Sequence, residues 1–192
     1  MDGVEIHNPY RLFGLTSAFN PETVENFELL TGGFSPKYGD RLSSILLIEN
    51  RPGNDETRFG GSTAVSLTDA NAVFEGRLPG QETGSWIVTA RRTYYDLVAN
   101  SLVGTELPAF GDLQGRLDWN LRPGTRLTFF GLLSREATDA FFEGDRAGEQ
   151  GDFVTAARND LAALKLTTLL GPSLSSRTIA SYYLKLDVMC VV

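Results

Sequence analysis

The sequence predicts a mainly β protein, in which a small mixed α/β region (residues 1–54) precedes antiparallel meander strands of an incomplete transmembrane β-barrel (residues 55–192). Three observations lead to this prediction. From about residue 62 the character of the chain changes to long segments that alternate between polar and apolar residues, several such segments follow one another, and the links between them alternate between short and long. No run of eighteen apolar residues exists, which excludes a transmembrane helix.

The first region contains turn-forming residues and short periodic segments. Asn20-Pro21-Glu22 predicts the start of a brief helix, with Asn20 as its cap and Pro21 at the first helical position. Phe27 to Leu30 and Leu42 to Ile48 are apolar runs followed by turn residues, so we expect two strands there. Together these elements predict the small mixed α/β region.

Asp112 to Leu121 is the clearest strand of the second region. Its polar residues are Asp112, Gln114, Arg116, Asp118 and Asn120, and they alternate with Leu113, Gly115, Leu117, Trp119 and Leu121. A strand of this length rises about 33 Å, and about 9 to 11 tilted residues cross the hydrocarbon of a bilayer. This strand is therefore long enough to span a membrane.

Four further segments alternate in the same way and are expected to be strands: 85–93, 126–134, 162–167 and 180–187. Thr63 to Leu78 also alternates but changes phase near residues 68–70, which predicts either a bulge or a tight turn. Ala156 to Leu170 also fits a helix loosely. Its Thr167-Thr168 pair and the following Gly171-Pro172 favour a strand.

The links between these strands differ in length. Residues 79–84, 122–124 and 171–173 form short links, whereas 94–109 and 136–152 form long ones, the first with helical spacing over Tyr94 to Val103. Outer-membrane barrels have short periplasmic turns at one rim and long extracellular loops at the other. The link lengths therefore favour such a barrel over a soluble meander.

Charge and residue usage exclude several classes of function. The net charge is −7, and no basic cluster offsets it, so nucleic acid is not expected as a partner. Cys190 is the only cysteine and His7 the only histidine, which argues against a zinc site and a Ser-His-Asp relay. We expect no enzymatic activity, no cofactor and no metal.

Four motifs in the first region resemble one family when their order and spacing are taken together. They are Asp2-Gly3-Val4, Asn8-Pro9-Tyr10-Arg11-Leu12-Phe13-Gly14, Asn20-Pro21-Glu22-Thr23-Val24-Glu25 and the segment from Gly32-Gly33-Phe34 to Leu42-Ser43-Ser44. They are similar to the C-terminal half of the plug domain of TonB-dependent outer-membrane receptors, in the subgroup with a carboxypeptidase-regulatory-like domain. The resemblance implies that residues 1–54 belong to the plug and residues 55–192 to the first barrel strands.

The sequence also departs from that family. It lacks a signal peptide, a TonB box, the first half of the plug and the terminal aromatic residue typical of outer-membrane barrels. A barrel with open edges leaves backbone groups unpaired in lipid. We therefore expect a fragment, or the product of a truncated gene, that does not function alone.

The resemblance implies a function, a location and partners. The family imports a ligand across the bacterial outer membrane, energised by the TonB-ExbB-ExbD complex, which would act through the missing N-terminal segment. Outer-membrane lipid and an unknown imported ligand complete the expected partners. Tyr10, Arg11 and Phe13 lie where an apical plug loop would contact the ligand, whereas packing of Tyr10 and Phe13 within the plug is the simpler explanation.

Arg41 is a candidate contact between plug and barrel. Glu75 and Asp118 fall on polar strand faces, where a charged partner is tolerated, so either is a candidate partner for Arg41. A pair of Arg41 with Asp40 or Glu49 inside the plug is the alternative.

Two other interpretations of the whole chain stay open. A small self-sufficient outer-membrane barrel, acting as an adhesin or structural protein, would need a closed set of eight strands. A soluble β-rich binding protein or enzyme would need its Leu, Trp and Phe faces buried against a second sheet.

Overall fold

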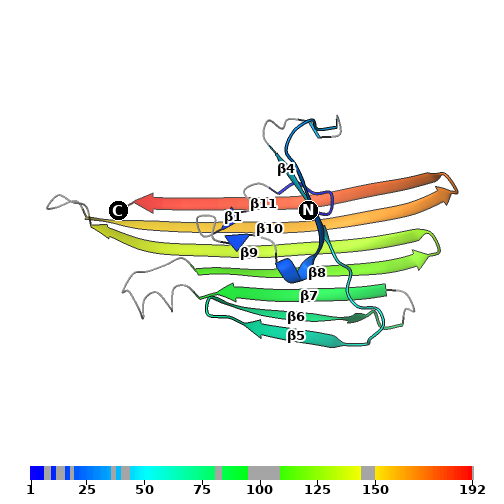
Figure 1. Cartoon of the computed structure of the whole chain (residues 1–192), viewed down its shortest axis with the longest axis horizontal. Helices are drawn as coiled ribbons and strands as arrows, with labels where there is room; N and C mark the ends of the chain where they lie inside the picture. The colour runs from blue at the N-terminus through cyan, green and yellow to red at the C-terminus, as the bar shows by residue number, and fades with distance from the viewer. Residues whose placement is uncertain are drawn as a thin grey trace.

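The computed structural model describes residues 1–6, 10–11, 16–17, 20–35, 38–39, 44–80, 84–94, 109–143 and 150–191. Its main feature is one antiparallel sheet of seven strands, drawn from cyan to red in Figure 1. The strands are β5 (Gly60–Val65), β6 (Asp69–Arg77), β7 (Gly84–Thr93), β8 (Ala109–Arg122), β9 (Thr125–Glu143), β10 (Gln150–Gly171) and β11 (Leu174–Val191).

Each of these strands pairs with its neighbours in the sequence, so the sheet is a meander with the order β11-β10-β9-β8-β7-β6-β5. The mainly β, antiparallel prediction is confirmed, and all five alternating segments lie within strands β7 to β11. The sheet is not a closed barrel, because β5 and β11 are its two edges.

The structure resolves two open points of the sequence analysis. Residues 60–77 form a hairpin, in which Ser66 donates its backbone N–H to the Asp69 carbonyl at 2.8 Å, so the phase change marks a tight turn and not a bulge. Ala156 to Leu170 is part of β10 and not a helix, because every residue from 153 to 169 pairs with β11. The expected helical spacing over residues 95–103 lies outside the described residues.

Strands β9 and β10 are longer than predicted. They contain 19 and 22 residues, so residues 136–143 and 150–152, expected in a long link, continue the β9–β10 ladder. The pattern missed this extension because alternation weakens there: Ala137, Ala140, Ala156 and Ala157 do not mark either face clearly.

The first region contains short strands only. β3 (Val24–Leu30) pairs with β4 (Ile45–Asn50), and β1 (Tyr10–Arg11) pairs with β2 (Thr16–Ser17). Asn20 does cap a helical turn, as predicted, but the turn is a 3-10 helix over Pro21–Thr23. The mixed α/β expectation is not supported within the described residues, because the chain passes directly from this turn into the β3–β4 hairpin.

The N-terminal region crosses one face of the sheet, as the blue segments and β4 show in Figure 1. We call this side, occupied by Ile87, Thr89, Gln114, Leu132 and Leu161, the covered face; these residues are at most 2% exposed. The opposite side, which we call the bare face, presents large apolar side chains to the exterior. Within the described residues, no helix is long and apolar enough to cross a membrane.

Candidate functional site

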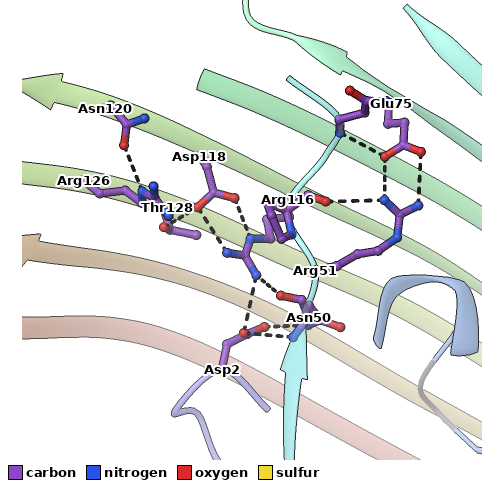
Figure 2. A network of polar contacts seen from close by, with 11 residues as sticks. Asp2, Asn50, Arg51, Glu75, Arg116, Asp118, Asn120, Arg126 and Thr128 are labelled. Atoms are coloured by element: carbon purple, nitrogen blue, oxygen red, sulfur yellow. Dashed lines mark hydrogen bonds and ion pairs between the residues drawn. The ribbon is translucent and has the colours of Figure 1, made fainter. Parts of the chain in front are cut away.

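The candidate site is the contact between the N-terminal region and the covered face of the sheet. This face is rich in polar residues because they occupy alternate positions along each strand. The buried polar residues of the covered face are Ser85, Thr89, Arg91, Thr93, Asp112, Gln114, Asp118, Thr128, Ser134 and Asn159. Arg51 of the N-terminal region, Arg116 of β8 and a group of amides connect the N-terminal region to this polar surface, and Figure 2 shows the contacts of the two arginines.

Arg51 forms the first ionic contact. Its guanidinium binds Glu75 of β6 through two nitrogens, with Nη1–Oε2 at 2.6 Å and Nη2–Oε1 at 3.2 Å. The same side chain donates through Nε to the Glu22 carbonyl at 2.8 Å, and the Asn54 backbone N–H donates to Glu75 at 3.0 Å. Arg51 thus joins the helical turn of the N-terminal region to the sheet.

Arg116 of β8 forms the second ionic contact. It binds Asp118 on its own strand (Nε–Oδ2 2.7 Å) and donates through Nη1 to the Asn50 carbonyl. The same Nη1 lies 3.7 Å from an Asp2 carboxylate oxygen. Asn50 in turn donates from Nδ2 to Asp2 at 2.5 Å, and Thr128 of β9 donates to Asp118 at 2.7 Å. Figure 2 shows these groups converging where β4 ends.

Amide and hydroxyl groups add a third set of contacts near the 3-10 turn. Asn20 and Asn71 of β6 exchange two hydrogen bonds, at 3.0 and 3.2 Å. The Thr23 hydroxyl lies 3.1 Å from Gln114 Oε1 of β8. Since Asn20 and Thr23 are at most 4% exposed, the turn is held deep against the covered face.

Gly53 brings the backbone of the N-terminal region directly onto β7. A Cβ at this position would lie 2.1 Å from the Trp86 carbonyl oxygen and 2.5 Å from its carbonyl carbon. Only glycine fits such a close approach without a shift of backbone. Residue 53 therefore fixes where the N-terminal region leaves the sheet.

A small apolar cluster lies beside the polar contacts. Met1, Val4 and Ile48 pack against buried residues of β9 and β10: Phe130, Leu132, Leu161 and Ala163. Full burial of such side chains contributes roughly 1.5 to 3 kcal/mol each. Burial lowers the pKa of the Met1 amino group, and the nearby Asp2 carboxylate offsets part of this effect.

A buried ion pair lies further along the covered face. Arg91 Nε of β7 is 2.6 Å from Asp112 Oδ2 of β8, and the two side chains are 7% and 0% exposed. The Arg91 guanidinium also lies 5.2 Å from the centre of the Phe110 ring. Its neighbour Arg92 is exposed, so the two consecutive arginines point to opposite faces, as expected from their positions in a strand.

Several buried polar atoms of this site have no hydrogen-bond partner among the described residues: Asn50 Oδ1, Thr89 Oγ1, Ser134 Oγ and Asn159 Nδ2. In a dry core each such atom costs about 1 to 3 kcal/mol.

Two of the site residues predicted from the sequence lie at this contact, and the structure does not describe the side chains of the others. Glu75 and Asp118 contact the arginine network, but Glu75 is bound by Arg51 and Asp118 by Arg116. Arg41 and Phe13 lie outside the described residues, as does His7; Tyr10 and Arg11 belong to β1, and their side chains are not described.

Sequence reasoning missed Arg51, Asn20 and Asn71 as contact residues. Arg51 falls within a turn signal, and the signal at Asn20 predicts only a cap. No local pattern indicates a partner 24 or 51 residues away along the chain. Arg116 was placed correctly on the polar face, yet its contact with Asn50 depends on tertiary structure.

Among the described residues, no group of three His, Cys, Asp or Glu residues is arranged to hold a metal ion. No protein-family model, no curated protein and no solved structure matches the chain.

Proposed function

We propose that the chain is part of a TonB-dependent receptor of the bacterial outer membrane, with residues 1–54 as the C-terminal half of its plug and residues 55–192 as the first strands of its barrel. In this role it would contribute to energised uptake of a ligand and would not act alone. One observation supports this most: the sheet has a polar face covered by the N-terminal region and an apolar face that no described residue covers.

The bare face has the composition of a lipid-contacting surface. Its large side chains remain substantially exposed: Phe74, Val88, Leu113, Trp119, Phe129, Leu133, Leu164, Tyr182 and Leu184, at 37–63%. Contiguous apolar surface of this extent marks a contact with a partner or a membrane. Strands that alternate apolar and polar residues, with the polar side facing inward, are the signature of outer-membrane barrels.

The height of the apolar surface also fits a bilayer. Register places four successive rows on this face, which pass through Leu113–Leu133, Gly115–Gly131, Leu117–Phe129 and Trp119–Leu127. Rows of one face are about 6.8 Å apart along a strand, so the four rows extend over about 20 to 27 Å along the strands, which the tilt of barrel strands reduces to about 15 to 22 Å of height. In β10 the first of these rows contains Asp160, opposite Leu133. The height approaches that of the apolar band of outer-membrane barrels, which is about 25 Å.

The polar contact between the two regions suits a plug that must move. A hydrogen bond or ion pair that can exchange with water contributes only about 0.5 to 1.5 kcal/mol net. The contact of Arg51 with Glu75, whose side chains are 31% and 20% exposed, can therefore be replaced by water when the N-terminal region is pulled. An extensive apolar interface would resist such displacement more strongly.

The two tryptophans of the chain provide a direct test, because Trp86 and Trp119 both alternate onto the bare face. The chain is refolded into bilayers of phosphatidylcholine with or without bromine atoms on the acyl chains. We expect brominated lipid to quench Trp119 fluorescence in the Trp86→Phe variant, and aqueous acrylamide to quench it weakly.

A second variant provides the control. Ser181→Trp in a Trp86→Phe/Trp119→Phe background places the indole at an exposed position of the covered face, opposite Ala163, and we expect no quenching by brominated lipid there. A chain that remains in water as a folded monomer, or equal quenching on both faces, would reject the receptor assignment in favour of a soluble β-rich protein.

A further inference from the structure

The bare face carries a row of arginines at one end of its apolar surface. Register connects Arg92 of β7 to Gly111 of β8, Gly111 to Arg135 of β9, and Arg135 to Arg158 of β10. The three arginines therefore lie in a single row across four neighbouring strands. Their positions in the alternation place all three on the same side as Leu113, Leu133 and Leu164.

Four charged residues of the bare face lie close together, in two neighbouring rows. From the Trp119 row to the row of Ala156, the bare face includes four charged residues: Arg92, Arg135, Arg158 and Asp160. Asp139 follows in the next row of this face, opposite Val154. Three positive charges against one negative charge leave a local excess of two. The other three rows toward the short turns contain apolar and aromatic residues, glycine and threonine.

Asp160 holds two of the arginines in place. Its Oδ1 lies 2.5 Å from Arg135 Nη1, and its Oδ2 accepts from Arg158 Nε at 2.7 Å. The Asp160 side chain is 12% exposed, whereas those of Arg135 and Arg158 are 49% and 46% exposed. The Asp160 carboxylate thus holds both guanidinium groups by hydrogen bonds, and about half of each arginine side chain remains exposed.

A hollow of about 470 Å³ opens beside this row. Small residues form its floor, and arginine and aliphatic side chains border it: Gly111, Ala137, Ala156, Arg135, Arg158 and Leu186. The hollow therefore combines positive charge with an apolar wall. Glu136 also lines it but belongs by alternation to the covered face.

We infer that this row and hollow bind the phosphate group of an anionic lipid, in the leaflet nearest the longer links. The inference rests on the proposed outer-membrane location. Arginine pairs with phosphate through two parallel hydrogen bonds, and the aliphatic wall of the hollow would contact the beginning of an acyl chain. The row lies at the end of β7 and the start of β8, where a bilayer surface would be, and β9 and β10 continue beyond it through residues 136–143 and 150–157.

The test compares lipid retention by matched variants. The chain is reconstituted in bilayers of phosphatidylcholine mixed with phosphatidic acid, extracted in mild detergent, and examined by native mass spectrometry. We expect the unaltered chain to retain phosphatidic acid in preference to phosphatidylcholine, and the Arg135→Ala/Arg158→Ala variant to lose this preference on the order of tenfold. Lysine at both positions should restore it in part, because charge remains but the paired hydrogen bonds do not.

The control variant is Arg126→Ala/Arg177→Ala. Both arginines lie opposite Thr167 of β10, Arg126 on β9 and Arg177 on β11, so they also belong to one row. They are exposed and lie on the covered face. We expect this variant to retain phosphatidic acid as the unaltered chain does. Equal retention by the Arg135/Arg158 alanine variant and the unaltered chain would overturn the inference, as would displacement of the lipid by inorganic phosphate alone.

Vesicle flotation, performed first, separates this inference from the proposed function. A chain that does not float with vesicles contradicts the outer-membrane assignment itself. A chain that floats and shows no preference for phosphatidic acid contradicts the lipid site only.

Discussion

Arg51 and Arg116 show how a few residues connect two parts of a chain that differ in character. Each guanidinium binds a carboxylate of the sheet and a backbone carbonyl of the N-terminal region. The planar group with several donors makes both contacts at once, which a lysine cannot reproduce in the same geometry. The individual contacts are modest in free energy, so the connection depends on their number.

Substitution of Glu75 tests the first of these contacts. Glu75→Gln removes the charge that binds Arg51 and is expected to lower the free energy of unfolding by about 1 kcal/mol, since the pair is partly exposed. Thermal unfolding in detergent micelles measures the change. The control is Asp187→Asn, which removes a more exposed ion pair with Lys185 at the sheet edge and should have almost no effect. Equal losses in both variants would contradict a specific role of Glu75.

Gly53 gives a second prediction at this scale. Gly53→Ala places a methyl group against the Trp86 carbonyl, so the N-terminal region must shift, and we expect a loss of about 2 kcal/mol in unfolding free energy. Gly32→Ala is the matched control, because nothing lies within 4 Å of a Cβ there. Chemical denaturation of both variants measures the difference. An unchanged Gly53→Ala variant would show that residue 53 does not rest on β7 in solution.

The strands illustrate what sequence can and cannot predict. Strand β8 was predictable because its two-residue alternation is a local property that pleating imposes on any half-buried strand. The Arg51–Glu75 contact was not, because the partner of a turn arginine depends on which strand lies beneath it. The cap at Asn20 was predictable as well, but the pairing of β3 with β4 limited the helix to one turn.

Two adjacent positions of β11 test the roles of the two faces. Ala180 and Ser181 are both small and exposed, and register places Ala180 opposite Leu164 and Ser181 opposite Ala163. In a bilayer, Ala180→Arg should cost about 2 to 4 kcal/mol of folding free energy, whereas Ser181→Arg should cost close to nothing. Unfolding from lipid vesicles measures both values. A soluble sheet would tolerate both substitutions equally, and that result would exclude lipid contact on the bare face.

The whole sheet is open, with β5 and β11 as edge strands (Figure 1). Unpaired backbone groups are costly in lipid, because hydrocarbon offers them no hydrogen bonds. We therefore expect the 192-residue chain, isolated in detergent micelles, to associate through its edges. Light scattering coupled to size-exclusion chromatography measures the mass of the protein component. A strictly monomeric, stable species would show that its edges need no partner.

The contacts of Asp2 and of Arg51 lie at opposite ends of the N-terminal region: Asp2 is near its start, and Arg51 is next to the point where it joins the sheet. A force applied near residue 2 would reach the Asp2–Asn50–Arg116 contacts first, and the Arg51–Glu75 clasp, next to Gly53, would be loaded last. In the proposed receptor the N-terminal region would then detach in stages and stay attached at residue 51, from which it could return to the covered face when the force ends.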